Sequence, residues 1–531
     1  MCDGWKKLYL IRSRWFAVLI PAILFFGVFT AIVTTIPDYG LTWDEPFYIE
    51  NAKALESWFT HAVSDTSFFS KESLEKYWNF GRPVKGLSGN VHPPFYKLSA
   101  IAFRHLLGTL LFNNIVYQYR VSTAFWTAIL VLMLFLVIRK FTLSNVWAIL
   151  GGLSFIVVPR FFAHAHFFAT DMIITSLGFS GLAVFTIASR SWTRILLGGV
   201  LFGAALATKF TGILAVAIVA PLIFISGDWK RFIREYCLMI ITACICFSLF
   251  NLPMLFNPYH ELEFYFSSVL DREKLLPITS IYFGKIYSFN LPIHQPWVML
   301  GITLPPIMVI TGIIGFFSGI VQFAKTGNKL AFFTIAPFWV LMSVYMLPST
   351  PKYDGIRLFS SVWPFIVLMS ILGCYWVQGL IKSQFKMGMS ICLIGLLFAF
   401  CDIKTYHPYE LSYYNIFIGG AKGAQDKGFM VTYWYDAFNK DFLRQMAKFV
   451  GTQKVGVYSW PNQEIIRWNQ VYGLYPAGLR SVSEQQEHKY IVVLNRILSK
   501  ATYERIKSSM PLIEISTRDG AYLGGLYQTK E

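Results

Sequence analysis

Long apolar runs recur along this chain of 531 residues. A helix of about 20 apolar residues crosses the roughly 30 Å of hydrocarbon in a bilayer, so each run is a candidate membrane span. Hydrophobic residues make up 55% of the chain and charged residues only 14%, and the mean hydropathy is +0.50. These values place the chain among polytopic α-helical membrane proteins and exclude an ordinary soluble enzyme.

The hydropathy pattern predicts about eleven transmembrane helices. We expect them at residues 15–36, 122–138, 146–158, 172–188, 195–208, 212–225, 237–256, 297–323, 330–347, 362–380 and 387–400. A half-apolar stretch, 95–112, is expected to lie on the membrane or to re-enter it. The fold class predicted from these runs is a polytopic helical membrane protein with a small α/β region after the last span.

The basic residues of the chain indicate its orientation. The net charge is +17, and Lys and Arg gather in the short loops on one side of the predicted spans. Because such loops are cytoplasmic in membrane proteins, the charge reflects topology rather than nucleic-acid binding. The N-terminus is then cytoplasmic, and the long loop 37–97 and the C-terminal region lie outside.

The composition changes near His407, and the chain becomes less apolar. Apolar periodicity predicts helices at 438–450 and 498–510 and strands at 454–460 and 489–494. Segments 512–516 and 521–527 are predicted to form a hairpin around Asp519-Gly520. We therefore divide the chain into a transmembrane domain, 1–406, and an external α/β domain, 407–531.

Two adjacent carboxylates, Asp44 and Glu45, follow the first span in the run Thr42-Trp43-Asp44-Glu45-Pro46. Carboxylates are costly in hydrocarbon, so they should lie at the interface or in a polar cavity. One carboxylate is sufficient as the base for sugar transfer from a lipid phosphate, because phosphate leaves without a protein acid. The alternative is a capped amphipathic helix, 47–59, lying on the membrane.

Three cations are predicted on the same outer face, Lys209, Lys352 and Arg357, and they are candidate ligands of a lipid phosphate. Asp354 is spaced to pair with Arg357, three residues on. The alternative is that these side chains reach toward lipid headgroups. Tyr353, in the same loop, is a candidate substrate contact.

Further outer-face motifs are candidate substrate or metal sites. His92-Pro93-Pro94 predicts a rigid turn that places His92 at the interface. The block 406–420, with Tyr413 and Asn415, suits sugar stacking or an interfacial aromatic belt. His164, His166 and Asp171 are spaced for a divalent metal, but a structural or substrate-contacting role for Asp171 is favoured. Seven Cys residues include no CxxC pair, so no zinc site or disulfide framework is predicted.

The motifs together resemble the dolichyl-phosphate-mannose protein mannosyltransferase superfamily, and especially bacterial members related to lipid A aminoarabinose transferases. The resemblance is carried by Thr42–Pro46 after the first span, His92-Pro93-Pro94, Asp171 at the start of a span, and the block 407–420. It implies a GT-C fold, a polyprenyl-phosphate sugar donor and inversion at the anomeric carbon. The family's first-loop acid falls on Asp44, with Glu45 beside it, and its second-loop acid on Asp171.

The resemblance implies a hexosyl- or pentosyltransferase of a bacterial inner membrane, with a protein, lipid or glycan acceptor. No long insertion like the luminal repeat module of eukaryotic protein mannosyltransferases is present, so the acceptor stays open. A transporter or flippase is the main alternative, and a scaffold bearing an outer domain is another. Inverted repeats are typical of transporters, and none is seen in the sequence, which favours the enzyme.

The predicted orientation can be tested with single cysteines placed at Ser483 and at Lys230. A membrane-impermeant thiol reagent added to intact cells should label position 483 and leave position 230 unlabelled until the membrane is opened. Labelling of position 230 before position 483 would contradict the orientation.

Overall fold

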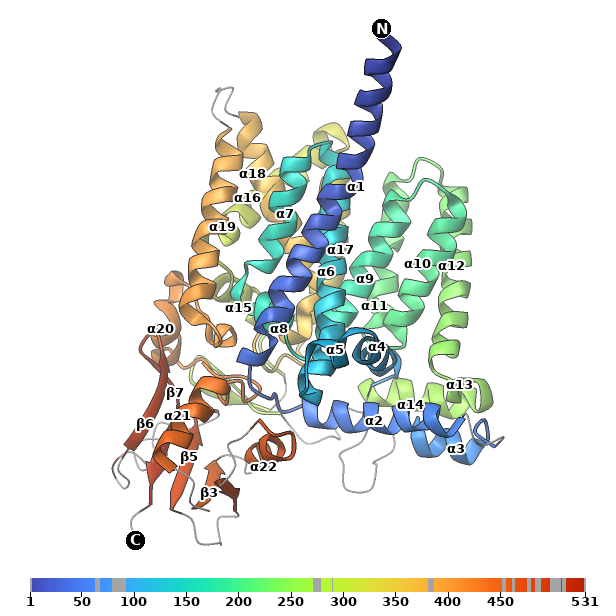
Figure 1. The fold of residues 1–531 in the computed structure, drawn as a ribbon. Coiled ribbons are helices and arrows are strands. Elements are labelled where there is room, and N and C mark those ends of the chain that lie inside the picture. Colours follow the sequence, from blue (N-terminus) through green and yellow to red (C-terminus); the bar gives the residue numbers. More distant parts are fainter. Residues whose placement is uncertain are drawn as a thin grey trace.

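The computed structural model describes residues 2–62, 67–78, 92–270, 278–288, 290–380, 386–450, 455–460, 464–474, 479–482, 489–496, 508 and 512–529 (Figure 1). The predicted helix 498–510 lies outside the described residues apart from residue 508, as do residues 89–91 before His92 and the labelling site Ser483. The described chain is mostly helical and forms a long bundle with a small mixed sheet at one end.

Eight helical segments of the described chain are long and apolar enough to cross a membrane. They are α1 (Cys2–Thr35), α6 (Ile115–Thr142), α9 (Thr170–Ile187), α12 (Trp229–Phe250), α16 (Pro306–Thr326), α17 (Lys329–Met346), α18 (Trp363–Leu380) and α19 (Met387–Tyr406). Shorter apolar helices stand among them, namely α7 (Asn145–Ile156), α10 (Ser191–Leu206) and α11 (Gly212–Ala217) with η3 (Ala220–Ile225). The predicted runs therefore coincide with helices of the bundle.

One predicted span is wrong in its continuity. Residues 297–323 form two helices, α15 (Gln295–Thr303) and α16, with extended backbone at Leu304 between them. Pro305 and Pro306 follow Leu304. A proline disfavours helical backbone in the residue before it and provides no N–H for a helical hydrogen bond, so the chain breaks here.

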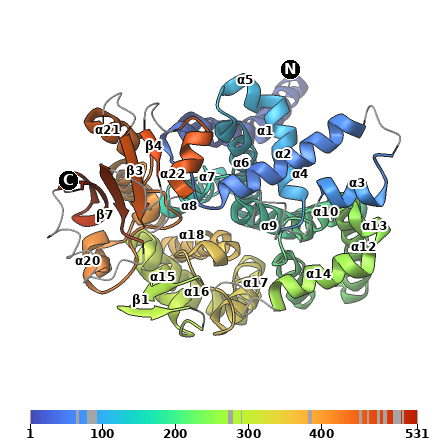
Figure 2. The ribbon, with the colours of Figure 1, turned by 90° about the horizontal axis from the view of Figure 1, so that it is seen from below.

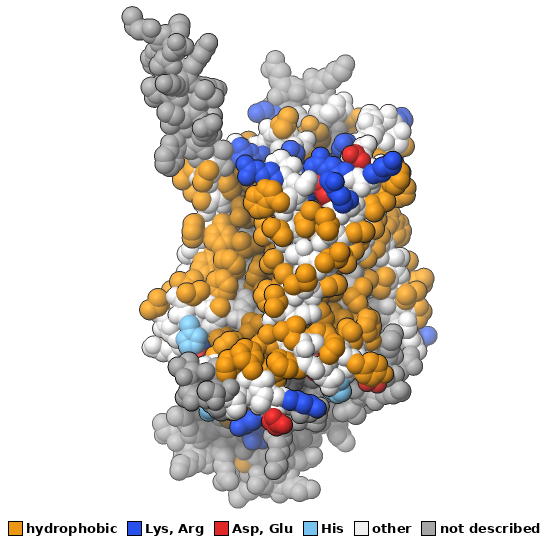
Figure 3. Space-filling model, turned by 90° about the vertical axis from the view of Figure 1, so that its right-hand side faces the viewer, with side chains coloured by type: hydrophobic (Ala, Val, Ile, Leu, Met, Phe, Trp, Pro, Cys, Tyr) orange, Lys and Arg blue, Asp and Glu red, His pale blue; other side chains and the backbone are white. Residues whose placement is uncertain are grey.

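The outside of the bundle is an apolar belt with a basic rim. Figure 3 shows hydrophobic side chains over the middle of one face and a band of Lys and Arg above them. Along α12 the side chains of Leu238, Ile241, Ile245 and Leu249 are exposed at helical spacing. An exposed apolar stripe flanked by charge suits contact with lipid, and the chain is an integral membrane protein.

Short helices lie across the end of the bundle opposite the N-terminus (Figures 1 and 2). They are α2 (Glu45–Ala62), α3 (Lys71–Tyr77), α4 (Phe95–Phe103) with η2 (Arg104–Gly108) and α5 (Thr109–Leu111), α13 (Pro253–Phe256) and α14 (Pro258–Leu270). The helix expected at 47–59 is thus part of α2, and the stretch 95–112 is helical over most of its length. The short helix α8 (Pro159–His164) and the hairpin of β1 (Ser280–Tyr282) and β2 (Lys285–Tyr287) complete this region.

A five-stranded sheet follows the last span, in the order β4-β3-β5-β7-β6. Strand β3 (Val455–Trp460) runs parallel to β4 (Leu479–Ser481) and β5 (Tyr490–Leu494), and β7 (Ala521–Gln528) runs antiparallel to β5 and β6 (Leu512–Arg518). Asp519 and Gly520 join β6 to β7 with φ of +47° and +72°. This is the backbone of a tight hairpin turn, so the predicted hairpin is confirmed.

The segment between the last span and the sheet is irregular. It contains η6 (Glu410–Ser412), η7 (Ile416–Ile418) and α20 (Gly420–Asp426). Helices α21 (Lys440–Val450) and α22 (Glu464–Val471) then accompany the sheet (Figure 1). Tyr472, after α22, donates its hydroxyl to Glu50 of α2 at 2.9 Å. The region after the spans therefore contacts the helix that begins beside Asp44.

Helices α16 and α18 pack closely because each presents a glycine to the other. A Cβ added to Gly315 would lie 1.7 Å from the carbonyl oxygen of Met369, and one added to Gly373 would lie 2.1 Å from that of Thr311. Small residues let membrane helices approach without the help of a hydrophobic driving force.

Gly315→Ala should therefore lower the thermal stability of the protein in detergent, at a cost of about 1 to 3 kcal/mol, because the methyl group has no room. Gly312→Ala, one helical turn away, is the matched control, since no atom lies within 4 Å of its added Cβ. Equal unfolding temperatures for the two variants would contradict close packing at Gly315.

Candidate active site

Asp44 lies directly before the first residue of α2, where the chain turns away from α1. Its Oδ2 accepts hydrogen bonds from Nη1 of Arg357 at 2.7 Å and from Nε1 of Trp434 at 2.8 Å. The side chain is 27% exposed. Its Oδ1 has no hydrogen-bond partner among the described residues. One oxygen of this carboxylate is thus held in place and the other is open to a ligand.

Arg357 opens the helix η5 (Arg357–Val362) and lies buried among carboxylates. Its Nη2 lies 3.0 Å from Oδ2 of Asp354. Its Nη1, which donates to Asp44, also lies 3.9 Å from Oδ2 of Asp171. The guanidinium carbon lies 4.0 Å from the ring centre of Trp434. The predicted pairing of Asp354 with Arg357 is present in the structure.

Asp171 is buried in the first turn of α9. Its Oδ1 accepts a hydrogen bond from Nζ of Lys209 at 2.6 Å, and its main-chain carbonyl accepts one from the hydroxyl of Ser360 at 3.2 Å. The structure therefore brings together four residues predicted from separate loops, namely Asp44, Asp171, Lys209 and Arg357. We call these four, with Asp354, the charged cluster.

Glu45 points away from the charged cluster although it is the next residue after Asp44. Its Oε1 and Oε2 accept hydrogen bonds from Nε and Nη2 of Arg120, both at 2.7 Å. The backbone amides of Thr42 and Phe168 also donate to it, each at 2.9 Å. Arg120 donates further to the carbonyls of the chain before Asp44. Glu45 is fully buried and occupied, so its geometry is that of a residue that fixes the loop.

Three predicted substrate-binding residues have different surroundings. The ring of Tyr353 lies 5.5 Å from the guanidinium of Arg357, next to the charged cluster. His92 lies 6.0 Å from the ring of Tyr48, one helical turn after Asp44. Lys352 instead donates to main-chain carbonyls in the segment after α17, those of Leu347 at 2.5 Å and Thr350 at 3.1 Å. Burial lowers the pKa of Lys352 to about 8.

Tyr413 and Asn415 hold the backbone together elsewhere. The hydroxyl of Tyr413 donates to Asp402 of α19 at 2.7 Å. The amide nitrogen of Asn415 donates to the carbonyls of Gly301 and Leu304, at 2.7 and 2.8 Å, where α15 ends. These contacts attach the block 407–420 to the bundle and leave neither side chain in the charged cluster.

The three candidate metal ligands do not form a ligand set. Both ring nitrogens of His166 are occupied at 2.7 Å, one by the hydroxyl of Thr35 and one by the carbonyl of Phe162. Burial lowers the pKa of His164 and of His166 to about 3, so both rings are neutral. Within the described residues no group of three His, Cys, Asp or Glu side chains is placed to hold a metal ion.

Trp434 of the site and the buried Lys97 were not among the residues predicted from the sequence. Trp434 comes from an irregular segment 390 residues after Asp44 and has no local signal. Lys97 lies on α4, which begins where the amide of Phe95 donates to the carbonyl of Ala207, close to Lys209. The side chain of Lys97 is buried and makes no ion pair or hydrogen bond to another described residue. Its Nζ lies 5.8 Å from the ring centre of Tyr96, and burial lowers its pKa to about 7. Nothing in the local sequence distinguishes this lysine from the others of the chain.

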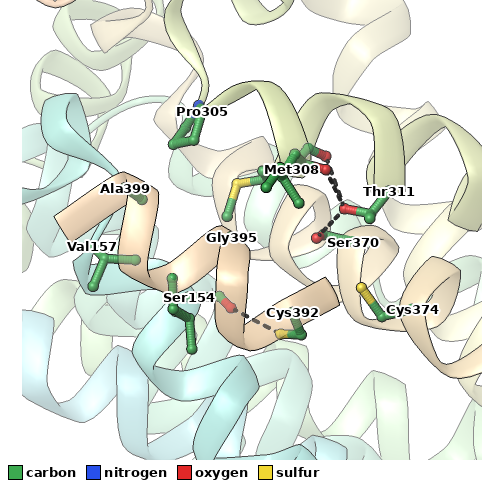
Figure 4. A pocket seen from close by; sticks show the side chains of 12 residues that line it. Ser154, Val157, Pro305, Met308, Thr311, Ser370, Cys374, Cys392, Gly395 and Ala399 are labelled. Carbon is green, nitrogen blue, oxygen red and sulfur yellow. Dashed lines mark hydrogen bonds between the residues drawn. The ribbon is translucent and has the colours of Figure 1, made fainter. Parts of the chain in front are cut away.

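A separate pocket lies inside the bundle between α7, α16, α18 and α19 (Figure 4). Its polar groups include the hydroxyls of Thr311 and Ser370, which are bonded to each other at 2.7 Å, and the thiols of Cys374 and Cys392. No charged side chain lines it, and it shares no residue with the charged cluster. Charge-based chemistry therefore belongs to the cluster and not to this pocket.

The chain is similar in structure to ArnT from Cupriavidus metallidurans in its crystal structure bound to undecaprenyl phosphate. The TM-score is 0.50 and the sequence identity 12%, with 96% of this chain and 97% of that chain covered. The chain has the GT-C fold. The predicted fold class is thereby confirmed, and the resemblance to the aminoarabinose transferases holds at the level of the fold.

The apo crystal structure of the same ArnT matches with a TM-score of 0.49 and 13% identity, over 96% of this chain and 97% of that chain. The archaeal oligosaccharyltransferase AglB from Archaeoglobus fulgidus, in complex with an inhibitory peptide and a dolichol-phosphate, matches with a TM-score of 0.44 and 12% identity, over 90% and 70%. No family model and no curated protein sequence matches the chain.

Proposed function

We propose that this GT-C protein is an inverting glycosyltransferase that moves a hexosyl or pentosyl unit from a polyprenyl-phosphate carrier to an acceptor hydroxyl. The observation that carries the proposal is the carboxylate of Asp44, with Oδ2 held by two donors and Oδ1 open, beside the cations Arg357 and Lys209. The crystal structure of the similarly folded ArnT bound to undecaprenyl phosphate supports a lipid-phosphate donor.

In the proposed reaction Oδ1 of Asp44 takes the proton of the acceptor hydroxyl. The acceptor oxygen attacks the anomeric carbon from the face opposite the phosphate and forms the new glycosidic bond. The bond from that carbon to the phosphate oxygen breaks, and its electron pair leaves with polyprenyl phosphate. One displacement inverts the anomeric centre, and nearby cations stabilise the departing charge without a protein acid.

The cations of the site have different capacities for a new phosphate. Arg357 and Lys209 are already paired with carboxylates, so a phosphate would share them with Asp44 and Asp171. Lys97 has no counter-ion among the described residues and lies on the helix that starts near Lys209. A buried lysine whose ammonium group lacks an ion-pair partner favours an anionic ligand. We assign Lys97 a share of the donor phosphate alongside Arg357 and Lys209, which belong to the charged cluster.

The proposal places the charged cluster on the external side of a bacterial inner membrane. The cluster lies at the end of the bundle opposite the N-terminus, where α1 ends and α9 and η5 begin (Figure 1). The basic sequence before the first span and the Lys and Arg rim of Figure 3 support a cytoplasmic N-terminus. Residues 407–531 then form the external region over the site.

Asp44→Asn keeps the shape and polarity of the side chain and removes the base. Turnover should fall about 10²- to 10⁴-fold, the usual contribution of a positioned base. Cells carrying the variant should accumulate the polyprenyl-phosphate sugar that cells with the wild-type chain consume. Mass spectrometry of lipids and envelope glycans from wild-type, variant and gene-deleted cells measures both. An Asp44→Asn protein that folds and leaves both pools at wild-type levels would refute the proposal.

The share of Lys97 in phosphate binding can be measured with undecaprenyl phosphate and purified protein in detergent. The pKa of Lys97 is lowered to about 7 in the free protein, and a bound phosphate raises it. Above about pH 7 the neutral Lys97 must therefore take up a proton when phosphate binds. The affinity of the wild type for undecaprenyl phosphate should thus decline between about pH 7 and pH 9, more than that of Lys97→Met does. At pH 7, Lys97→Met should bind about tenfold more weakly than the wild type.

Lys352→Met is the matched control for this measurement, since Lys352 is also a buried lysine with a lowered pKa but donates to backbone carbonyls. Its affinity and pH dependence should match those of the wild type in protein that remains folded. Weaker binding by Lys352→Met than by Lys97→Met would reverse the assignment.

A further inference from the structure

Trp434 contacts both charged partners at the centre of the site. Its indole Nε1 donates to Oδ2 of Asp44 at 2.8 Å, and its ring lies 4.0 Å from the guanidinium carbon of Arg357. The side chain is buried. One indole therefore holds the carboxylate by a hydrogen bond and its ion-pair partner by a cation–π contact.

The backbone around Trp434 is strained into place. Trp434 and the next residue, Tyr435, have φ of +58° and +66°, in the left-handed region that residues with a side chain rarely adopt. Such conformations persist only where the surroundings impose them, and they concentrate at functional sites. The carbonyl of Trp434 accepts the amide of Trp43 at 3.0 Å, so this turn is bonded directly to the residue before Asp44.

The turn is also supported by Arg160 of α8. Its guanidinium carbon lies 4.9 Å from the ring centre of Tyr433, the residue before Trp434, and its Nε donates to the carbonyl of Tyr413 at 3.0 Å. The hydroxyl of Tyr433 donates to the carbonyl of Met430 at 2.7 Å. The indole itself packs against the rings of His164 and Phe167, with ring centres 5.7 and 5.8 Å away. Its position is thus set by buried contacts and not by Asp44 alone.

We infer that Trp434 is the positioning residue of the base, through which the segment after the last span completes the membrane site. This inference rests on the proposed function. With Arg357 and Trp434 both on Oδ2, the proton-accepting atom is Oδ1, and the indole N–H stabilises the ionised carboxylate that the reaction needs. Arg357 of η5 is the charged group bonded to Asp44, and Asp171 of α9 and Asp354 before η5 lie around Arg357, with Lys209 after α10 bonded to Asp171. The phenols of Tyr48 in α2 and Tyr96 in α4 also face Asp44, and burial together with the negative charge of Asp44 raises the pKa of both.

Three variants separate the hydrogen bond from the ring and from general packing. Trp434→Phe keeps a ring on Arg357 and removes the N–H, whereas Trp434→Gln keeps an N–H donor and removes the ring. Trp363→Phe is the matched control, because Trp363 is buried and stacked on Phe161 but its Nε1 has no hydrogen-bond partner in the described chain.

Initial rates are measured from about pH 5 to pH 8 as release of polyprenyl phosphate by purified protein. The donor is the lipid fraction that accumulates in Asp44→Asn cells, and membranes of gene-deleted cells supply the acceptor. Trp434→Phe should lower kcat about tenfold with little change in KM, as expected for a lost hydrogen bond to a charged group. The fall in rate at acidic pH should begin at a higher pH in Trp434→Phe than in the wild type. The rates of Trp434→Gln and Trp363→Phe should fall at the same pH as that of the wild type, so both keep the wild-type acidic limb of the pH–rate curve.

The inference is overturned if Trp434→Phe keeps the wild-type rate and acidic limb, or if Trp434→Gln shifts the limb as far as Trp434→Phe does. These results are distinct from failure of the proposed function, which shows as normal turnover by folded Asp44→Asn. A shift in Trp363→Phe equal to that in Trp434→Phe would assign the effect to packing and would also overturn the inference.

Discussion

The burial of Arg357 is the constraint on which the site depends. A guanidinium cannot lose its proton, so inside a membrane protein it must be surrounded by acceptors. Asp44, Asp171 and Asp354 surround it, and they come from three separate parts of the chain. Removing one partner of such a group leaves a buried charge uncompensated, at a cost of about 3 to 5 kcal/mol. The loop after α1, the start of α9 and the turn before η5 are therefore held together by one side chain.

The neighbouring acids Asp44 and Glu45 show how environment separates two similar groups. Arg120 occupies both oxygens of Glu45, and the backbone amides of Thr42 and Phe168 occupy what remains, away from solvent. Asp44 is left with one open oxygen. A carboxylate whose acceptor sites are all filled stiffens a loop, and one with a free lone pair in a partly exposed position can exchange a proton with a ligand. Glu45 thereby supports the geometry in which Asp44 is available.

The region after the last span contributes to the site in spite of its distance in sequence. Trp434 bonds to Asp44, and Tyr472 bonds to Glu50 on the helix that follows it. Asn415 fixes the intervening block to the end of α15. A region anchored at several points beside the charged cluster holds its dipoles in a fixed orientation, and in the proposed enzyme such fixed dipoles stabilise the charge that develops during transfer.

The local features of this protein could be predicted from its residues. Apolar runs long enough to span a bilayer predicted the helices of the bundle, and the turn residues Asp519-Gly520 predicted the hairpin. The charges of the loops predicted that Asp44, Asp171, Lys209 and Arg357 lie on one face, and the structure brings these four together. These predictions succeed because hydropathy, helix length and turn conformation depend on neighbouring residues. The break at Leu304 was missed because its prolines lie inside a run that is apolar throughout.

Which side chains meet depends on how the whole chain packs. Glu45 and Asp44 are adjacent and chemically alike, yet Arg120 binds one and Arg357 the other. Lys352 turns to backbone carbonyls, whereas Lys97, which carries no distinguishing local pattern, is left buried without a counter-ion. Trp434 reaches Asp44 across 390 residues. The direction of a side chain and its long-range partners follow from packing of the whole chain, and a single sequence contains no local record of that packing.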